Sequence, residues 1–471
     1  MSGIRGWTWL WAAAAWTVLA AGCGGTFGGG AGDVADGDAG TESDGADLAP
    51  DVGGDADAPL DADGGGDAGG DADVAEEAEA LPTGTLTVHT GPGGTPANAP
   101  FLAFRDGDGD WQVGAGTDGL YEFECTTGRY GILVIGGRMR RTVEVFYGTM
   151  ADASTVAFLG APVELTPGSS DIAGSVSGVG PLEGLTLCLT GHAERVLDVP
   201  PPVGGSYSWT VPGGTYVLTA LRAAGGVAQQ SFRSGSFAAP VGGAVDIDVA
   251  FTAAAPLTIE RTAALSGLDP SETYVLGSEL LTRADEGCPV SSTSTGEALR
   301  VVSESILSPG EIHRVRLAAT GPAADYVRVA DVCSRAASAP SLELPARPSS
   351  APVVSAISTA PPRLGAQFEP QGWVELYRLE ARQTPATHGW VVQATAGWLA
   401  GGDRLAMPDL SGAAGWNAAF ELVPSEPIDW TWLTLATTAG PPMPGHEPSV
   451  PPPESFGRQF IERSGTMTVG P

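Results

Sequence analysis

Histidine is the side chain most often used as a general base or zinc ligand, so its spacing is the first test for chemistry in this chain. The five histidines are scattered, at His89, His192, His313, His388 and His446, and none sits in a complete His-Glu-x-x-His frame. No Gly-x-Ser-x-Gly nucleophile elbow is present either. We therefore predict a non-enzymatic protein without a cofactor. An envelope hydrolase, with its site assembled from distant strands, is an alternative.

Lysine chemistry is excluded outright, because all 23 basic residues are arginine. The chain can hold neither a phosphate-loop lysine nor a Schiff-base lysine nor a Ser-x-x-Lys nucleophile. The formal net charge of -32 also makes nucleic acid an unsuitable partner.

Two short motifs resemble ligand sites, but the residues around each motif argue against binding. In Asp106-Gly-Asp-Gly-Asp-Trp111 the oxygens alternate as in a calcium loop, but Trp111 occupies the place of the turn glycine, so we predict a polar turn. Gly114-Ala-Gly-Thr-Asp-Gly119 matches a dinucleotide fingerprint, yet an alternating strand follows in place of a helix. We predict no metal site and no nucleotide site.

Cysteines and tryptophans supply the remaining candidates. Apart from Cys23, the cysteines are Cys125, Cys188, Cys288 and Cys333, an even number that permits three connectivities. We favour a Cys288–Cys333 disulfide, because both residues fall in one expected domain and closing their loop contributes about 4 kcal/mol in the chain-entropy model. Cys125 and Cys188 fall in different domains, so they either bridge these domains or stay free.

Half of the tryptophans lie after residue 370, and exposed rings there could stack on sugars. The candidate stacking residues are Trp373, Tyr377, Trp430 and Trp432. The competing interpretation is that these rings fill the core of a β-sandwich.

Cys23 ends an apolar N-terminal stretch that begins at Trp7 and follows a charged start at Arg5. This stretch is too short to span a bilayer and is typical of a secretory signal. Ala20-Ala-Gly-Cys23 resembles the lipobox of bacterial lipoproteins, which implies that Cys23 is lipidated and anchors the mature chain in the cell envelope. The alternative is an ordinary signal peptide. Gly24 carries no retention aspartate, which by analogy with other lipoproteins favours the outer membrane, with possible exposure at the cell surface.

The tract after the signal is acidic and rich in glycine and alanine, with 17 acidic residues between Gly24 and Ala80 and no basic residue. Such a segment buries too little apolar surface to offset the entropy of ordering it. We predict a disordered, extended tether over 23–81.

From Leu81 onward, short alternating strands are separated by Gly, Pro and Asp turns, which predicts an all-β protein of tandem antiparallel sandwiches. Two stretches repeat at a constant offset of 86 residues, so that Tyr121 matches Tyr207 and Tyr130 matches Tyr216. In each copy an aromatic strand, a glycine turn and a second strand opening with tyrosine predict an antiparallel hairpin.

The repeated segment is similar to carboxypeptidase-regulatory-like (transthyretin-like) sandwiches over 84–158 and 171–251. Val211-Pro-Gly-Gly214 keeps the pattern of that family, and Cys125-Thr-Thr-Gly128 departs from it. The resemblance implies non-catalytic modules that act as spacers or contact protein or carbohydrate. Further on, Leu265–Leu276 and Pro362–Leu379 resemble strands of immunoglobulin-like or fibronectin-type sandwiches.

We therefore expect a signal peptide at 1–22, the tether at 23–81, sandwich copies at 82–165 and 166–252, and β-rich domains at 253–350 and 351–471. The alternative is that 253–350 and 351–471 together form one sandwich. The expected function is structural or adhesive display of these modules on a lipid anchor, with the membrane and a protein or polysaccharide ligand as partners. Carbohydrate binding is the first alternative function.

Overall fold

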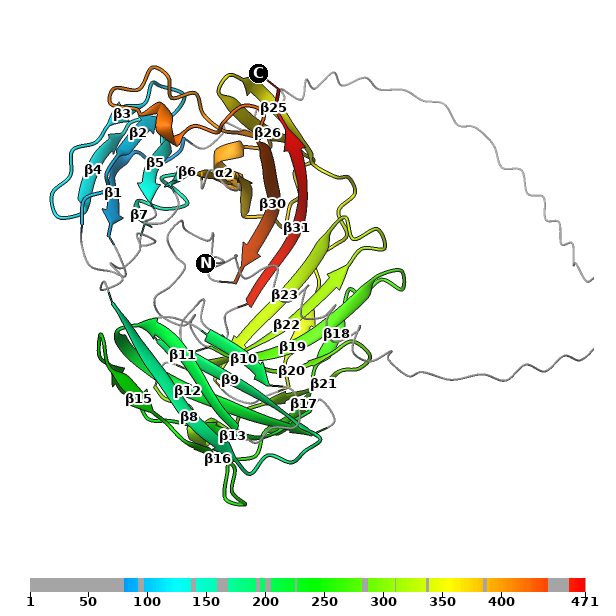
Figure 1. The fold of residues 1–471 in the computed structure, drawn as a ribbon. Coiled ribbons are helices and arrows are strands. Elements are labelled where there is room, and N and C mark those ends of the chain that lie inside the picture. Colours follow the sequence, from blue (N-terminus) through cyan, green and yellow to red (C-terminus); the bar gives the residue numbers. More distant parts are fainter. Residues whose placement is uncertain are drawn as a thin grey trace, which may run out of the picture. The chain divides into compact units, whose positions relative to one another are not determined.

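The computed structural model describes residues 80–91, 97–136, 141–158, 168–191, 195–199, 205–224, 227–281, 287–309, 311–335, 339–383, 388–438 and 457–470. Cys23, the signal and nearly all of the expected tether lie outside this part of the chain. The described chain is almost entirely β, which confirms the predicted fold class (Figure 1). Within it, no helix has the length and apolar character needed to cross a membrane.

The first repeat copy is a two-layer sandwich. One layer contains β1 (Gly84–Thr90), β4 (Leu120–Cys125) and β7 (Thr155–Phe158). The other contains β2 (Leu102–Asp106), β3 (Gln112–Val113), β5 (Arg129–Gly136) and β6 (Arg141–Thr149). Alternate side chains such as Val88, Tyr121 and Ile132 form the core between the layers.

The second copy repeats this arrangement. Its first layer contains β8 (Ser169–Ser177), β11 (Gly205–Pro212), β15 (Ala244–Asp246) and β16 (Val249–Ala250). Its second layer contains β9 (Glu183–Gly191), β10 (Arg195–Val199), β12 (Gly214–Ala224), β13 (Val227–Arg233) and β14 (Phe237–Ala239). The orders β4-β1-β7 and β11-β8-β15 correspond, as do β2-β5-β6 and β9-β12-β13. In both copies the last pair of the first layer is parallel. The 86-residue repeat is thus a repeat of topology.

The expected hairpin is wrong in both copies. β4 pairs with β1, whereas β5 pairs with β2 and β6, so the glycine turn at Gly128 joins two different layers. Gly128 has a φ of 74°, which favours glycine. The side chains of Tyr121 and Tyr130 then enter the same core from opposite sheets. A connection between two layers thus accounts for the spacing of these two residues, and a hairpin is not needed.

The next segment forms a sandwich around its own core. Its strands are β17 (Ile259–Thr262), β18 (Ala264–Ser266), β19 (Thr273–Leu281), β20 (Gly287–Thr293), β21 (Ala298–Val301), β22 (Ile312–Thr320), β23 (Val327–Ser334) and β24 (Ser341–Glu343), with a short 3-10 turn, η2 (Glu304–Ile306). Leu276, Leu299 and Leu317 lie in its core.

The C-terminal segment contains β25 (Val353–Thr359), β26 (Pro362–Gln367), β27 (Leu376–Arg382), β28 (His388–Thr395), α2 (Ala396–Leu399), β29 (Arg404–Ala406), η3 (Ala418–Phe420), β30 (Pro427–Thr437) and β31 (Gly457–Thr468). β25, β26 and β29 form a separate sheet. The core contains Trp390, Trp398 and Trp432.

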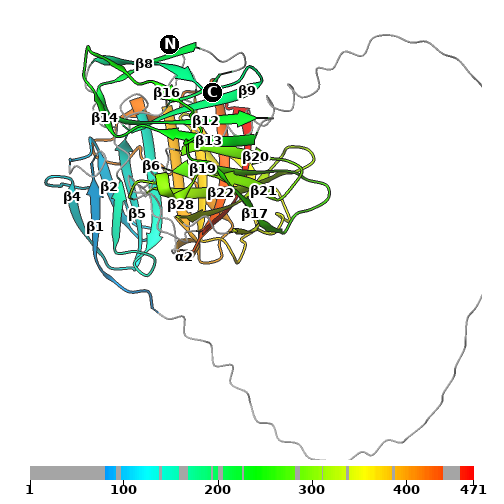
Figure 2. The same cartoon turned by 90° about the horizontal axis from the view of Figure 1, so that it is seen from below.

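Three of the expected domains share one sheet of twelve strands, in the order β20-β19-β22-β23-β31-β30-β27-β28-β6-β5-β2-β3. β23 and β31 pair in antiparallel fashion (Figure 1), and β28 pairs in parallel with β6 (Figure 2). Backbone hydrogen bonds therefore join segments far apart in sequence, and residues Ala80–Pro471 form one compact unit. The bounds of the four expected ranges stay a prediction.

Candidate functional site

Two of the aromatic residues expected to stack on sugars are buried. Tyr377 and Trp432 are 2% and 3% exposed, and both rings pack on Phe368 with centroid distances of 4.5 and 4.7 Å. Trp373 and Trp430 are partly buried against the same core. A stacking role is therefore wrong for Tyr377 and Trp432, because neither ring has a free face. Large apolar residues alternate with polar ones along β30, and this pattern indicates a strand that packs one face on a core.

The disulfide joins Cys188 of β9 to Cys288 of β20, with the Cα atoms 5.6 Å apart. The favoured Cys288–Cys333 pairing is wrong because these residues lie on β20 and β23, which are separated by β19 and β22. Three strand spacings amount to about 14 Å, beyond the reach of a disulfide. Cys188 and Cys288 meet because the outer face of the second copy packs on β20.

Cys125 and Cys333, the other two cysteines among the described residues, are buried thiols. Burial is the main cause that raises the pKa of Cys125 to about 11 and that of Cys333 to about 12. The carboxylates of Asp106 and Asp331, respectively, add to the effect. Both thiols are thus protonated at neutral pH and are poor nucleophiles.

The acidic motif that begins at Asp106 is a turn, as expected. The Asp106 carboxylate accepts hydrogen bonds from the backbone N–H of Thr126 at 2.9 Å and that of Thr127 at 3.1 Å, and from both hydroxyls. Burial alone would raise the pKa of Asp106, but these four hydrogen bonds hold it well below its usual value. Its oxygens are occupied by the turn. Across the described ranges, no group of three potential ligands is placed to hold a metal ion.

His313 is the histidine with the most unusual environment. It is 3% exposed on β22, and neither ring nitrogen has a hydrogen-bond partner in the described chain. His89 is exposed on β1, and His388 Nε2 lies 2.9 Å from the Ala419 carbonyl oxygen. His192 and His446 lie outside the described residues.

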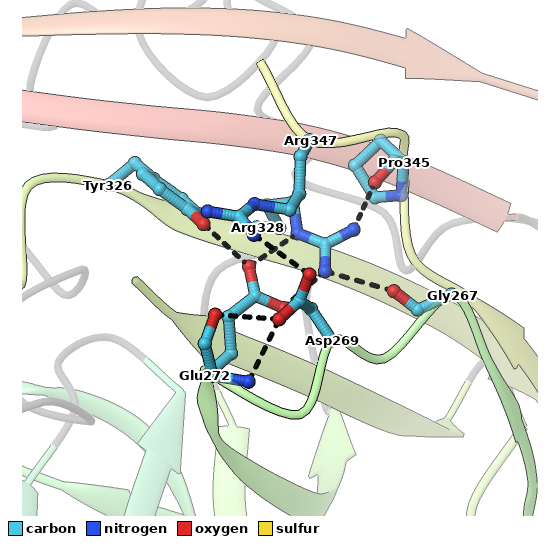
Figure 3. A network of polar contacts seen from close by, with 8 residues as sticks. Gly267, Asp269, Glu272, Tyr326, Arg328, Pro345 and Arg347 are labelled. Atoms are coloured by element: carbon cyan, nitrogen blue, oxygen red, sulfur yellow. Dashed lines mark hydrogen bonds and ion pairs between the residues drawn. The ribbon is translucent and has the colours of Figure 1, made fainter. Parts of the chain in front are cut away.

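A buried ionic network centres on Arg328 of β23 (Figure 3). Its side chain is 2% exposed and that of Glu272 is 0% exposed, and the two form an ion pair. Arg328 also donates to the backbone carbonyls of Gly267 at 2.9 Å and Pro345 at 2.5 Å, and Tyr326 donates to Glu272 at 2.9 Å. Burial works to raise the pKa of Glu272, but the hydrogen bonds from Arg328 and Tyr326 lower it.

This network fastens chain segments. The loop before β19 and the chain after β24 are held to β23 by a single guanidinium, and Arg347 adds an ion pair with Asp269 at 2.8 Å. The donors of Arg328 point at protein acceptors (Figure 3). We infer a structural role for the network, with no site for substrate.

A second joint lies between the first copy and the C-terminal segment. The guanidinium of Arg105 lies 5.3 Å from the Tyr147 ring centroid and 5.5 Å from that of Trp398. Arg129 lies 4.3 Å from the Trp398 ring and donates to its backbone carbonyl at 2.6 Å. Tyr147 and Trp398 stack with centroids 5.0 Å apart. Such cation–π contacts each contribute about 0.5–2 kcal/mol, so they fasten α2 to β2, β5 and β6.

Glu380 and Glu462 form the acid pair that comes nearest to an acid–base arrangement. Burial and then the charge of Glu380 raise the pKa of Glu462 to about 7. Glu380 is half-buried, and although burial works to raise its pKa, ion pairs with Arg378 and Arg382 lower it. Environments that push two carboxyl pKa values apart are typical of catalytic acids and bases. However, neither carboxylate lines the cavity beside Arg233 or the smaller one beside Trp432.

Those cavities differ in size. One, of about 20 Å³, lies beside Trp432 and has room for one water molecule. The other, of about 420 Å³, lies beside Arg233 of β13. Sequence reasoning missed Arg233, Arg328 and Glu462, because their partners come from strands distant in sequence and no local motif marks them.

No family model matches this chain, and no curated protein matches it. Similar solved structures include the FN1–FN3 domains of chicken CNTN1, at 9% identity over 62% of this chain and 90% of that chain, with a TM-score of 0.15. A Streptococcal ancillary pilin matches at 10% identity over 57% of this chain and 100% of that chain, also with a TM-score of 0.15. An alpha-2-macroglobulin from Escherichia coli matches at 8% identity over 83% of this chain and 42% of that chain, with a TM-score of 0.14. These scores are too low to support an argument about fold or function.

Proposed function

We propose that this chain is a lipid-anchored cell-envelope protein that displays non-catalytic β-sandwich modules for structural or adhesive protein interaction. The observation that carries the proposal is the twelve-stranded sheet, which joins β-sandwich strands from three sequence segments by backbone hydrogen bonds. A head built in this way is suited to transmitting force or presenting a fixed surface.

Three joints support this reading. The disulfide links the second copy to β20, the Arg328 network fastens the loop before β19, and the rings of Tyr147 and Trp398 bind the first copy to α2. The disulfide and the buried ion pair are each worth several kcal/mol when broken. A protein that must open and close around a substrate would not need all three.

The lipid anchor rests on the sequence around Cys23. The test is to express the full chain and its Cys23→Ser variant in a Gram-negative host fed with labelled palmitate. We expect only the unchanged chain to incorporate the label and to be found in the membrane fraction. Equal partitioning of the two chains into the membrane would contradict the anchor.

The display role is tested on whole cells. Cells that carry the full chain should expose it to added protease and should adhere more strongly to each other or to immobilised proteins than cells that carry the Cys23→Ser variant. If the chain is present at the surface and adhesion is unchanged over a broad panel of proteins, the adhesive role is wrong.

A further inference from the structure

β25 is an edge strand whose second side has no partner strand in the described chain. In the sheet β25-β26-β29 it pairs with β26 only, in an antiparallel ladder that runs from Val353 opposite Gln367 to Thr359 opposite Pro362 (Figure 1). In such a ladder, alternate residues point both their N–H and their C=O away from the partner strand. No other backbone hydrogen bond of residues 353–359 is found within the described ranges. β25 therefore offers a row of free donors and acceptors to a further strand.

The usual protection of an edge strand is missing from β25. Proteins protect a free edge with charged residues, with proline or by keeping the strand short. β25 has seven residues and contains neither a charged residue nor a proline. The uncharged stretch around it extends from Pro348 to Pro362. By contrast, the edge strand β3 has only two residues, and the edge strand β4 carries Glu122 and Glu124.

The outer face of β25 is apolar at both ends and polar in the middle. Val354 packs against the core, so Val353 and Ser355 lie on the opposite, outer face. The bulge of the ladder falls at Ile357, whose side chain still reaches this face, because its Cγ2 lies 3.0 Å from the position of a Cβ added to Gly365, the partner of Ser355. Val353 is 63% exposed and Ile357 is 43% exposed. Two large apolar side chains thus flank an exposed serine.

We propose that β25 is the interface between two copies of this chain, which pair edge to edge in antiparallel fashion about a twofold axis at Ser355. A twofold interface requires a surface that is complementary to itself. The order apolar–serine–apolar meets this requirement, because it places Val353 of one copy opposite Ile357 of the other and the two Ser355 side chains opposite each other. The uncharged stretch also keeps like charges out of the contact between two chains that each have a net charge of -32.

The pairing joins two three-stranded sheets into one continuous sheet. One pair of strands is smaller than a standard protein interface, so the dimer should be weak, with a Kd of about 1–100 μM. This interface goes beyond the proposed display function and does not depend on the lipid anchor, so either proposal can fail without the other.

The first measurement is the oligomeric state of the Cys23→Ser chain, which carries no lipid, by sedimentation equilibrium from about 1 to 300 μM. We expect a reversible equilibrium between monomer and dimer. A chain that stays monomeric up to the highest concentration does not pair with itself, and the proposal is then wrong, whether β25 accepts a strand of another protein or none.

Variants at Ser355 then locate the interface. Ser355→Arg places two like charges directly opposite each other and should raise the Kd at least tenfold, and Ser355→Glu should do the same. An equimolar mixture of these two variants places opposite charges at the axis and should restore the dimer, which separates a lost interface from a lost fold. Ser208→Arg, at an exposed serine of the edge strand β11, is the matched control and should leave the Kd unchanged.

Two results of these variants would overturn the proposal. A dimer that tolerates both Ser355→Arg and Ser355→Glu is formed by another face of the molecule. A mixture of the two variants that stays monomeric contradicts a twofold axis at Ser355.

Discussion

His313 should make the protein lose stability in mild acid. Its imidazole is 3% exposed on β22, and both ring nitrogens lack a partner in the described chain. Burial is the main cause that lowers its pKa to about 4. The nearby carboxylate of Glu304 opposes this shift, whereas the charges of Arg261 and Arg335 add to it.

The sign and size follow from proton linkage. In the unfolded chain a histidine has a pKa of about 6.5, so between pH 6.5 and 4 the unfolded state binds a proton that the folded state does not. Stability is therefore fully present above pH 6.5 and falls as the pH drops towards 4. The full difference between the two pKa values corresponds to about 3 kcal/mol.

The assay is the free energy of opening of β22, measured by hydrogen exchange in increasing urea between pH 4 and pH 8. His313→Leu keeps an apolar side chain of similar size at the buried position and should remove about 3 kcal/mol of the pH dependence. His89→Leu, on the exposed side of β1, is the control and should leave it unchanged. An identical slope in the unchanged chain and in His313→Leu would refute the reasoning.

Three further predictions concern Glu462, the disulfide and the Arg328 network. Burial and a neighbouring carboxylate raise the pKa of Glu462 to about 7, so its charged form is disfavoured in the fold. Glu462→Gln should stabilise the protein by up to about 3 kcal/mol at pH 8 and leave it unchanged below pH 4.5, as measured by urea unfolding. Cys188→Ser together with Cys288→Ser should cost about 5 kcal/mol, seen as a lower Tm without reductant, and mass spectrometry of the unchanged chain should find the Cys188–Cys288 peptide pair. Arg328→Met should cost about 3–5 kcal/mol because it leaves Glu272 buried and unpaired, and adding Glu272→Gln should recover part of this loss.

Local patterns predicted the strands and the repeat. Alternation of large apolar residues fixes which side of a strand is buried, and the offset of 86 residues placed Tyr130 and Tyr216 at matching positions of β5 and β12. Both rings are fully buried and both hydroxyls donate to backbone carbonyls, of Ala153 and Pro212 respectively. Equivalent sequence positions therefore have equivalent packing.

The pairing of sheets and cysteines could not be predicted because it depends on outer faces. A hairpin and a connection between layers have the same alternation, so the pattern around Gly128 does not separate them. One signal was available: Ile132 to Ile135 is an unbroken apolar run, which indicates a strand buried on both faces. A strand that is buried on both faces implies that another part of the protein covers the outer face of the first copy.

The two outer faces explain why a repeat leads to a single unit. Ile135 and Leu221 are equivalent by the 86-residue offset, and both are buried on the outer side of their sandwiches. Ile135 packs in the core that contains Trp390, whereas Leu221 packs beside the Cys188–Cys288 disulfide. The inner cores thus keep the common fold, and the outer faces differ so that each copy has its own neighbour. Modules that are separated along a flexible chain need polar outer faces, because these faces meet water. The two apolar outer faces therefore favour one rigid unit over a flexible array of separate modules.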